Sequence, residues 1–384
     1  MRREAEALAD TGFDVDVICM RSPGRPRRAV INGVTVISLP TNRRLGGSKT
    51  RYTLDYGRFF VLAAGLLAVR HLRRPYHVVQ AHSMPDFLVF AAVVPKLLGS
   101  KVIAYMGEPT PELLETLFGP SWLSRVLVFI EQRALRFADH SFTVTDQLKE
   151  QYVKRGAVPE RMTVVLNGVD PGMMPAIGSP PRAEGRSDFI AVCHGTVEDR
   201  YGQDTIIEAA RLLRDEIGGL RFVITGRGSL VTQITKAIAD YGLQDVVRFE
   251  GWVSRATLAD ILRSADVGIV AQKASPYSHL IHTNKMVDFW ICGLPVIASR
   301  LRAISETYDD RVIEYFEPGN AADLAAAIRR VRYEHGRRAE LAENGKLALL
   351  KNGWPAQREA YLDVFADLLR ERHGRQPDRG ADAR

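Results

Sequence analysis

The sequence predicts an α/β protein that contains two parallel sheets, one in each of two domains. With 384 residues the chain is long enough for two such domains of ordinary size. Short apolar segments alternate with helical patterns, which is typical of parallel strands that helices cover on both faces. A stretch rich in Pro and Gly at 171–186 separates these segments into two groups. We therefore expect a domain at 1–170, a linker at 171–186 and a second domain at 187–353.

The first domain is predicted to begin with a charged amphipathic helix at 1–12, which runs straight into a strand at 13–19. Such a start has no signal-peptide character. Further short buried strands are predicted at 34–39, 77–81, 102–105, 141–144 and 163–166. The three cysteines are far apart and lie in apolar contexts, which favours the reducing cytoplasm over a disulfide framework or a zinc site.

The second domain repeats the alternation of strands and helices. Its strands are predicted at 189–193, 221–225, 247–250, 267–271 and 296–299. A further helix is expected at 354–370. Beyond it the chain combines Arg with Gly and Pro, so we expect residues 371–384 to form a disordered tail.

The chain is basic, with a formal net charge of +7 and a pI near 9.3. This charge indicates an anionic partner, and a nucleotide, an acidic lipid or a nucleic acid would each satisfy it. The basic residues are scattered, without an aromatic-interleaved or helix-turn-helix pattern. A nucleic acid is therefore the partner that the sequence favours least, and we expect none.

The most informative segment is 284–299, where a charged helix start leads into a buried strand. Lys285 and Asp288 are three residues apart, so they share one face of a helix that begins near Thr283 or Asn284. Free N–H groups at a helix start favour phosphate oxygens, and an acid one turn further on can accept hydrogen bonds from a ribose diol. The alternative is an ordinary amphipathic helix followed by a strand.

This segment resembles the donor-nucleotide segment of the retaining glycosyltransferases of family 4, whose usual pattern is Lys-Leu-x-Glu followed by Gly-x-Pro-Val-Ile. The resemblance implies the GT-B fold, in which two Rossmann-like domains face a central cleft and a C-terminal helix crosses back to the first domain. It implies that Lys285 grips the diphosphate and that Asp288 binds the ribose, with Thr283 and Asn284 also at the donor. In that family a first strand precedes the helix expected at 1–12, so this strand is expected to be missing here.

A second segment, 194–204, resembles the family pattern Gly-Arg-x-x-x-x-Lys-Gly-x-Asp. The positions that align are Gly195, Gly202 and Asp204. Thr196 stands where most members have Arg, and Tyr201 stands where they have the basic phosphate ligand. Arg200 lies one residue early, and the resemblance implies that it shares the cationic grip on the diphosphate with Lys285. The alternative is that Arg200 is a solvated loop residue.

Other positions follow the family order less specifically. Gly226 and Gly228 follow a strand, where they resemble a turn that approaches the donor, although a plain turn is the commoner use of Gly-x-Gly. Val253 ends a segment that resembles the one facing the nucleotide base. The family often has an acid eight residues before the position of Asp288, but Leu280 stands there. His282 is nearby, and we expect an exposed loop histidine there, with a sugar contact as the alternative.

Two residues of the first domain resemble the acceptor side of the family's cleft. His82 belongs to a His-Ser-x-Pro-Asp loop that follows a strand, and Glu108 stands where many relatives have Asp before Pro-Glu. The alternative for each is a satisfied or exposed loop residue. Asp14 and Asp16 match a metal-binding Asp-x-Asp only superficially, because they lie in an alternating strand and are expected to face solvent. We expect no metal and no cofactor.

Residues 51–74 contain eleven consecutive apolar residues between arginines. This stretch is too short to span a bilayer, but it is suited to an interfacial helix at a membrane surface. A buried core helix is the alternative. The enzyme is expected to be cytoplasmic, and peripheral at the membrane if this helix binds lipid.

The resemblance covers nearly the whole chain in the right order, and it implies a retaining glycosyltransferase (EC 2.4). It is expected to move a sugar from a UDP- or GDP-type donor to a glycan or lipid-linked acceptor in the synthesis of surface polysaccharide or glycolipid. Two kinds of alternative remain open. One is an epimerase or phosphorylase on the same fold, and the other is a non-catalytic nucleotide-binding protein, which the residues at 196 and 280 would suit.

Overall fold

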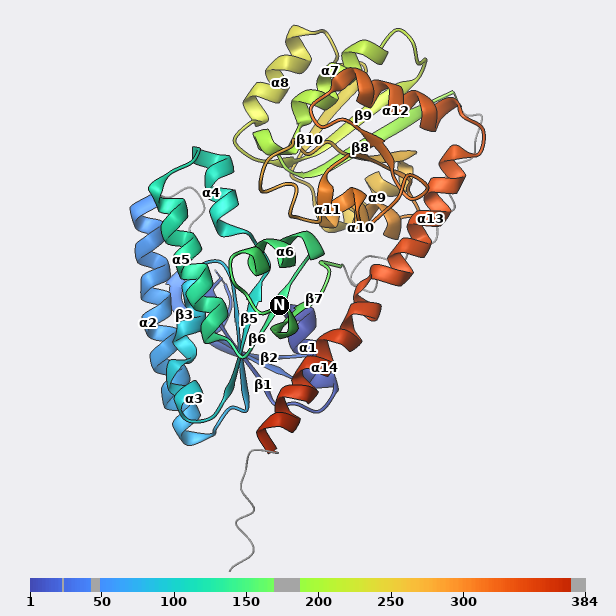
Figure 1. The fold of residues 1–384 in the computed structure, drawn as a ribbon. Helices are drawn as coiled ribbons and strands as arrows, with labels where there is room; N and C mark the ends of the chain where they lie inside the picture. Colours follow the sequence, from blue (N-terminus) through green and yellow to red (C-terminus); the bar gives the residue numbers. More distant parts are fainter. Residues whose placement is uncertain (23, 43–48, 169–186, 374–384) are drawn as a thin grey trace, which may run out of the picture. The chain divides into compact units, whose positions relative to one another are not determined.

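The computed structural model describes all residues except 23, 43–48, 169–186 and 374–384 (Figure 1). The linker expected at 171–186 and nearly all of the expected tail therefore lie outside the described residues. The chain divides into two compact units, which are described separately. Unit 1 comprises Met1–Val165 and Gln357–Arg384, and unit 2 comprises Leu166–Ala356.

Unit 1 contains seven described strands. The elements are α1 (Arg2–Asp10), β1 (Val15–Arg21), β2 (Arg28–Ile31), β3 (Val34–Asn42), α2 (Lys49–Arg73), β4 (Val78–His82), η1 (Asp86–Ala92), α3 (Val93–Leu97), β5 (Lys101–Met106), α4 (Thr110–Phe118), α5 (Trp122–Phe137), β6 (His140–Thr143), α6 (Asp146–Lys154), η2 (Pro159–Arg161), β7 (Met162–Val164) and α14 (Trp354–His373). β4, β5, β6 and β7 form a parallel sheet in that order, while β1, β3 and β2 form a second, mixed sheet. The sequence predicted a single sheet here. The described strands form two sheets instead, because β1 pairs only with β3, β4 pairs only with β5, and β1 and β4 do not pair with each other.

β2 was not predicted, and it is antiparallel to its partner β3. Asn32 and Gly33 connect the two strands with φ angles of 46° and 77°. An Asn-Gly pair is the usual occupant of such a two-residue hairpin turn, because both positions need positive φ. The hairpin signal was therefore present in the sequence.

The core of unit 1 is closed by residues from the end of the chain. β5 is central, and its Val102 and Ile103 are fully buried. Tyr361 of α14 packs on Phe142 of β6 with ring centroids 4.8 Å apart, and its hydroxyl donates a hydrogen bond to Gln80 Oε1 at 2.9 Å. The last helix is thus an integral part of the first unit.

Unit 2 is a single parallel sheet that helices cover on both faces (Figure 1). Its elements are β8 (Phe189–Thr196), η4 (Asp199–Tyr201), α7 (Gln203–Leu213), β9 (Leu220–Arg227), α8 (Val231–Asp240), β10 (Val247–Gly251), α9 (Arg255–Ser264), β11 (Val267–Val270), α10 (Asn284–Ile291), β12 (Val296–Ser299), α11 (Arg302–Ser305), β13 (Glu314–Phe316), α12 (Ala321–Tyr333) and α13 (Arg337–Asn352). The strand order is β10-β9-β8-β11-β12-β13. α7, α8 and α12 enclose one core, and α9, α10, α11 and part of α13 enclose the other.

The strands of unit 2 explain this two-sided core. Phe222 and Ile224 of β9 face the α7–α8 side, while the intervening Val223 packs on the α9–α10 side. Successive side chains of a strand point to opposite faces, so an apolar run is buried on both sides only when both faces are covered. No helix in the described part of the chain is long and apolar enough to cross a membrane.

Candidate functional site

The residues singled out in the second half of the sequence come together at the carboxyl ends of the strands of unit 2. Gly195 lies at the end of β8, Gly226 at the end of β9, and Lys285 in the first turn of α10. The carboxyl edge of an open parallel sheet is where ligands of doubly wound proteins bind. Thr283 is the N-cap of α10, and its Oγ1 accepts a hydrogen bond from the Lys285 N–H at 3.4 Å.

Two cations share one aromatic ring at this edge. Lys285 Nζ lies 3.9 Å from the centroid of the Tyr201 ring, and Arg200 Cζ lies 4.8 Å from the same centroid. Within the described part of the chain, no ion pair joins either cation to a carboxylate, and the buried Arg200 Nε has no hydrogen-bond partner. Burial lowers the pKa of Lys285, and the nearby Arg200 lowers it further. The pair is therefore a positive site that a bound anion would neutralise.

The η4 turn that carries Arg200 is fixed from the neighbouring strand. Lys273, three residues beyond β11, places its Nζ 2.7 Å from both Asp199 Oδ1 and Asp204 Oδ2. The Lys273 N–H also donates to the Arg200 carbonyl at 2.9 Å. The sequence analysis did not single out Lys273, although its place just after a predicted strand end was the available signal. Arg200 is half-buried, which contradicts its reading as a solvated loop residue.

Two glycines allow the backbone to lie against this cationic pair. A Cβ at Gly195, where φ is +111°, would lie 2.9 Å from Lys285 Cε, and a Cβ at Gly226 would lie 1.7 Å from the Gly195 carbonyl oxygen. Glycine avoids both contacts and tolerates these φ values. Gly228 packs directly on the backbone of Val197. These glycines therefore let neighbouring backbone segments pack closely beside Lys285, and an approach of the Gly226–Gly228 turn to a donor stays a prediction.

Asp288 lies one turn into α10, next to a histidine that the sequence analysis did not assign. Its Oδ2 lies 3.7 Å from Nε2 of His194, and that nitrogen is buried without a hydrogen-bond partner. Burial raises the pKa of Asp288 to about 6, against the opposing charge of Arg255. Burial, helped by Lys285, lowers the pKa of His194 to about 4. At neutral pH the site thus presents a carboxylate acceptor beside an uncharged imidazole.

Two other predicted donor positions belong to the carboxyl edge of the same sheet. Asn284 is exposed at the start of α10, and Val253 is half-buried just beyond β10. Trp252, next to Val253, is 67% exposed, and Arg227 Cζ lies 6.0 Å from its ring.

His282 and Leu280 both belong to the core of unit 2. His282 is buried, and its Nε2 lies 3.0 Å from the Tyr308 hydroxyl, so the expectation of an exposed loop histidine is wrong. Burial lowers its pKa to about 4, which keeps the imidazole uncharged. Leu280, in the place of the family's first acid, is 8% exposed. An apolar side chain at this position fits its surroundings.

In unit 1, His82 ends β4 and Glu108 follows β5, the neighbouring strand. His82 Nε2 lies 2.9 Å from the Gln80 amide nitrogen and 3.9 Å from Glu4 Oε2, and its ring stacks on Tyr105 with a centroid distance of 4.7 Å. Burial lowers the pKa of His82 to about 4, although Glu4 opposes the shift. Glu108 is half-buried. The two residues therefore lie at one edge of the β4–β7 sheet.

The Asp-x-Asp at the start of β1 is structural. Asp16 Oδ2 accepts hydrogen bonds from Arg70 Nη2 at 2.7 Å and from the Tyr76 hydroxyl at 2.6 Å, while Asp14 pairs with Arg74. Asp16 is largely buried under these partners, so the expectation that both acids face solvent is wrong for it. Elsewhere in the described residues, no three His, Cys, Asp or Glu side chains gather as a metal site would require.

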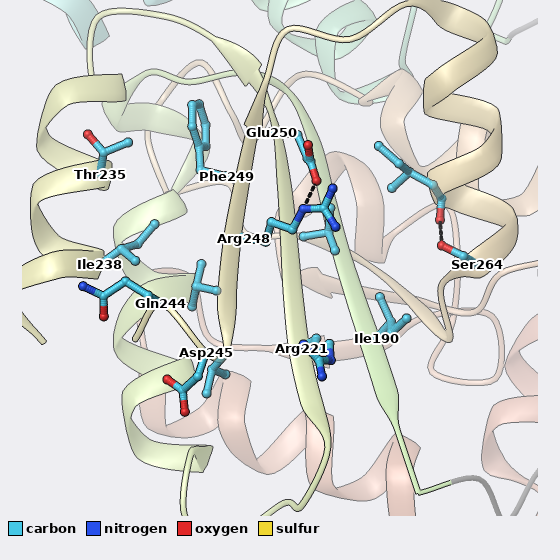
Figure 2. A pocket seen from close by; sticks show the side chains of 14 residues that line it. Ile190, Arg221, Thr235, Ile238, Gln244, Asp245, Arg248, Phe249, Glu250 and Ser264 are labelled. Carbon is cyan, nitrogen blue, oxygen red and sulfur yellow. Dashed lines mark hydrogen bonds and ion pairs between the residues drawn. The ribbon is translucent and has the colours of Figure 1, made fainter. Parts of the chain in front are cut away.

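A hollow of about 490 Å³ follows the edge strand β10. Figure 2 shows Thr235 and Ile238 of α8 on one side of it, Ser264 of α9 on the other, and the paired Arg248 and Glu250 between them. The hollow extends to Ile190 and Arg221, near the amino ends of β8 and β9. It is therefore separate from the cationic pair, which lies beyond the carboxyl ends of the strands.

Comparison with known families matches both halves of the chain. Residues 1–168 match the model of the glycosyl transferase 4-like domain, and residues 188–332 match that of the glycosyl transferases group 1. A D-inositol 3-phosphate glycosyltransferase of Catenulispora acidiphila is 26% identical over 95% of this chain and 88% of its own length. One from Kineococcus radiotolerans is 26% identical over 99% of this chain and 91% of its own length.

Solved structures have the same fold. Sucrose-phosphate synthase from Thermosynechococcus elongatus aligns with a TM-score of 0.75 at 18% identity, over 96% of this chain and 92% of that one. The Anabaena protein Alr3699/HepE in complex with UDP-glucose aligns with a TM-score of 0.68 at 15% identity, over 92% of this chain and 99% of that one.

Proposed function

Because the chain is a group 1 glycosyltransferase with the GT-B fold, we propose that it transfers a sugar from a nucleotide-diphosphate donor to an acceptor hydroxyl with retention of anomeric configuration. The cationic pair on Tyr201 is the observation that carries this proposal. It provides two positive charges that have no carboxylate partner among the described residues, and these charges lie beside a capped helix start, which is the environment that a diphosphate needs.

Lys285 and Arg200 act on the leaving group. As the bond between the sugar and the diphosphate breaks, negative charge accumulates on the diphosphate, and fixed cations stabilise it without reorganisation. The acceptor hydroxyl then attacks from the same face as the leaving group. This reaction uses no protein nucleophile, and we propose that it uses no metal ion. Arg200 and Lys285 are thus the proposed catalytic residues.

The rest of the site selects the donor. Asp288, ionised at neutral pH, accepts hydrogen bonds from the ribose diol. The backbone of Gly226 and Gly228 borders the diphosphate, and Val253 borders the base. Solved relatives contain UDP or UDP-glucose, which supports a UDP-sugar as the first donor to test and a GDP-sugar as the second.

The acceptor is proposed to contact His82 and Glu108 in unit 1. The names of relatives point to two kinds of acceptor: several are D-inositol 3-phosphate glycosyltransferases, and one is an amylovoran biosynthesis glycosyltransferase of Erwinia amylovora. We propose a glycan or lipid-linked acceptor, with D-inositol 3-phosphate as the alternative to test. We place the reaction in the cytoplasm. The helix expected at 51–74 is α2, which buries Ala63 and Leu67 against unit 1 but exposes Val61 and Leu72, so a membrane contact through its outer face stays a proposal.

Calorimetric titration with UDP and GDP tests the donor site. Wild-type protein is expected to bind one of them, and Lys285→Ala and Asp288→Asn are expected to lose that binding. Lys236→Ala is the matched control, because this lysine is exposed on α8 and forms an ion pair with Asp240. Binding that survives in both site variants would contradict the assignment.

Turnover separates transfer from the alternatives. With UDP-glucose alone, slow hydrolysis should release glucose whose anomeric configuration, read by NMR before mutarotation, matches that of the donor. Release of the opposite anomer would refute retention. A changed nucleotide sugar would indicate an epimerase. Tight nucleotide binding without hydrolysis, and without transfer to any tested acceptor, would favour the non-catalytic alternative that Thr196 and Leu280 leave open.

A further inference from the structure

An apolar ridge runs over unit 1 from the end of α4 along the outer face of α5. The two helices pack against each other (Figure 1). The large apolar side chains exposed there are Leu117, Phe118, Trp122, Leu123, Val126 and Phe129, which we call the α4–α5 ridge. Trp122 is 75% exposed, Phe118 58% and Phe129 54%. These side chains are among the most costly to leave in water.

The ridge is large for a protein surface. Taking about 200 Å² for a whole aromatic side chain, the three aromatic residues alone expose on the order of 400 Å². The largest contiguous apolar patch on a typical monomer covers roughly 300–600 Å² and is often functional. With the three aliphatic residues added, the α4–α5 ridge reaches the upper part of that range. It is therefore a candidate for an interaction surface.

The exposed charged side chains of α5 are all positive. Arg125, Arg133 and Arg136 are exposed, and Arg133 Cζ lies 4.8 Å from the Phe129 ring. The only acid of α5, Glu131, is fully buried and accepts hydrogen bonds from Arg155 at 2.9 and 3.2 Å. The outer face of α5 thus combines aromatic and basic side chains without an exposed acid.

We propose that the α4–α5 ridge docks on a lipid surface that contains anionic headgroups. Aromatic side chains enter the boundary between headgroups and acyl chains, while arginines beside them contact lipid phosphates. A second copy of the chain is a poorer occupant. In a twofold contact through α5, the arginines of both copies would face one another, and α5 offers no exposed acid to neutralise them.

The ridge is a different surface from the outer face of α2. Among the side chains of α2 that the structure describes, the large apolar ones that are exposed are aliphatic, and they include Val61 at 66% and Leu72 at 70% exposure. The ridge instead carries Trp122 and Phe129. Trp is enriched at membrane–water interfaces, and both residue types occur on the apolar face of interfacial helices. This inference does not depend on the donor site or on sugar transfer.

Co-flotation with vesicles of phosphatidylcholine, with and without phosphatidylglycerol, tests the proposal on the full chain. Wild-type protein is expected to float with the anionic vesicles and to bind them less as salt is raised. Trp122→Glu/Phe129→Glu should reduce the partition coefficient at least roughly tenfold. Arg125→Gln and Arg133→Gln should each reduce it about fivefold on anionic vesicles.

The control is Tyr333→Glu/Leu350→Glu, which introduces the same charges at exposed positions of unit 2. It should float like wild type. Because all the substituted ridge side chains are exposed, far-ultraviolet circular dichroism should be unchanged in each variant.

Fluorescence quenching and sedimentation test the proposal further. Brominated lipid should quench Trp122 in a Trp252→Phe background, since the other two tryptophans, Trp290 and Trp354, are buried. The proposal is overturned if wild-type protein does not bind anionic vesicles. It is also overturned if Val61→Glu/Leu72→Glu abolishes binding while the ridge variant binds normally, or if sedimentation shows a dimer that the ridge variant dissociates.

Discussion

Replacing Lys285 by Met should weaken donor binding without destabilising the protein. The methionine keeps an unbranched apolar stem over Gly195 but removes the charge. Lys285 has no carboxylate partner among the described residues, and both burial and Arg200 lower its pKa. Its charge is therefore a cost to the unliganded protein, and removing it should leave the free energy of unfolding unchanged or raise it by about 1 kcal/mol.

The expected loss of binding is larger. A hydrogen bond between charged groups contributes about 1.5–3 kcal/mol, so UDP should bind roughly 10- to 150-fold more weakly. Calorimetry gives the affinity. Thermal unfolding with and without UDP gives the stability, and the ligand-induced rise of Tm should shrink accordingly.

Lys236→Met, at the exposed ion pair with Asp240, should change neither affinity nor stability. A Lys285→Met protein that unfolds at lower temperature than wild type and still binds UDP normally would refute the reasoning. In that case the lysine would be a structural residue rather than an anion ligand.

Gly195→Ala should lower the free energy of unfolding by about 1–3 kcal/mol and weaken UDP binding, because the residue has positive φ and the new methyl group displaces Lys285. Gly319→Ala, also at positive φ but with open space for a Cβ, should show only the stability loss in the same urea and calorimetric measurements. Binding of UDP-glucose should strengthen as pH rises through about 6, where Asp288 ionises, and Asp288→Asn should flatten this profile. In unit 1, burial raises the pKa of Asp86 to about 7, so its folded state holds a proton that the unfolded chain releases above pH 4. Stability is therefore lost as pH rises towards 7, and the advantage of Asp86→Asn in urea unfolding should be on the order of 3 kcal/mol greater at pH 8 than at pH 5.

The sequence could point to the segments of the proposed donor site because their signals are local. Lys285 and Asp288 are three residues apart, and a helix start and a glycine stop frame them within one short stretch. The alternation of apolar segments likewise predicted parallel sheets. β13 was missed because it has three residues and contains Glu314, whose buried carboxylate is held by Arg330 and Arg337. With one charged residue among three, the strand has too few apolar residues for a strand pattern to be recognised in the sequence.

What the sequence could not predict depends on contacts between distant segments. Lys273 binds Asp199 and Asp204, about seventy residues earlier, so no local pattern relates them. Tyr201 looked like the loss of a basic ligand, but its ring lies beneath two cations contributed by different elements. His282 looked like a loop residue because its partner, Tyr308, is 26 positions away.

The position of Tyr361 has a consequence for how the protein is made. Its ring and hydroxyl complete the packing around Phe142 and Gln80. The core of the first unit therefore needs α14, which is the last helix to be synthesised. Unit 2 has its whole sequence some time earlier and can fold while unit 1 is still waiting. A released chain that ends just before Gln357 should therefore protect unit 2 from protease while unit 1 is still cut, although unit 1 is synthesised first.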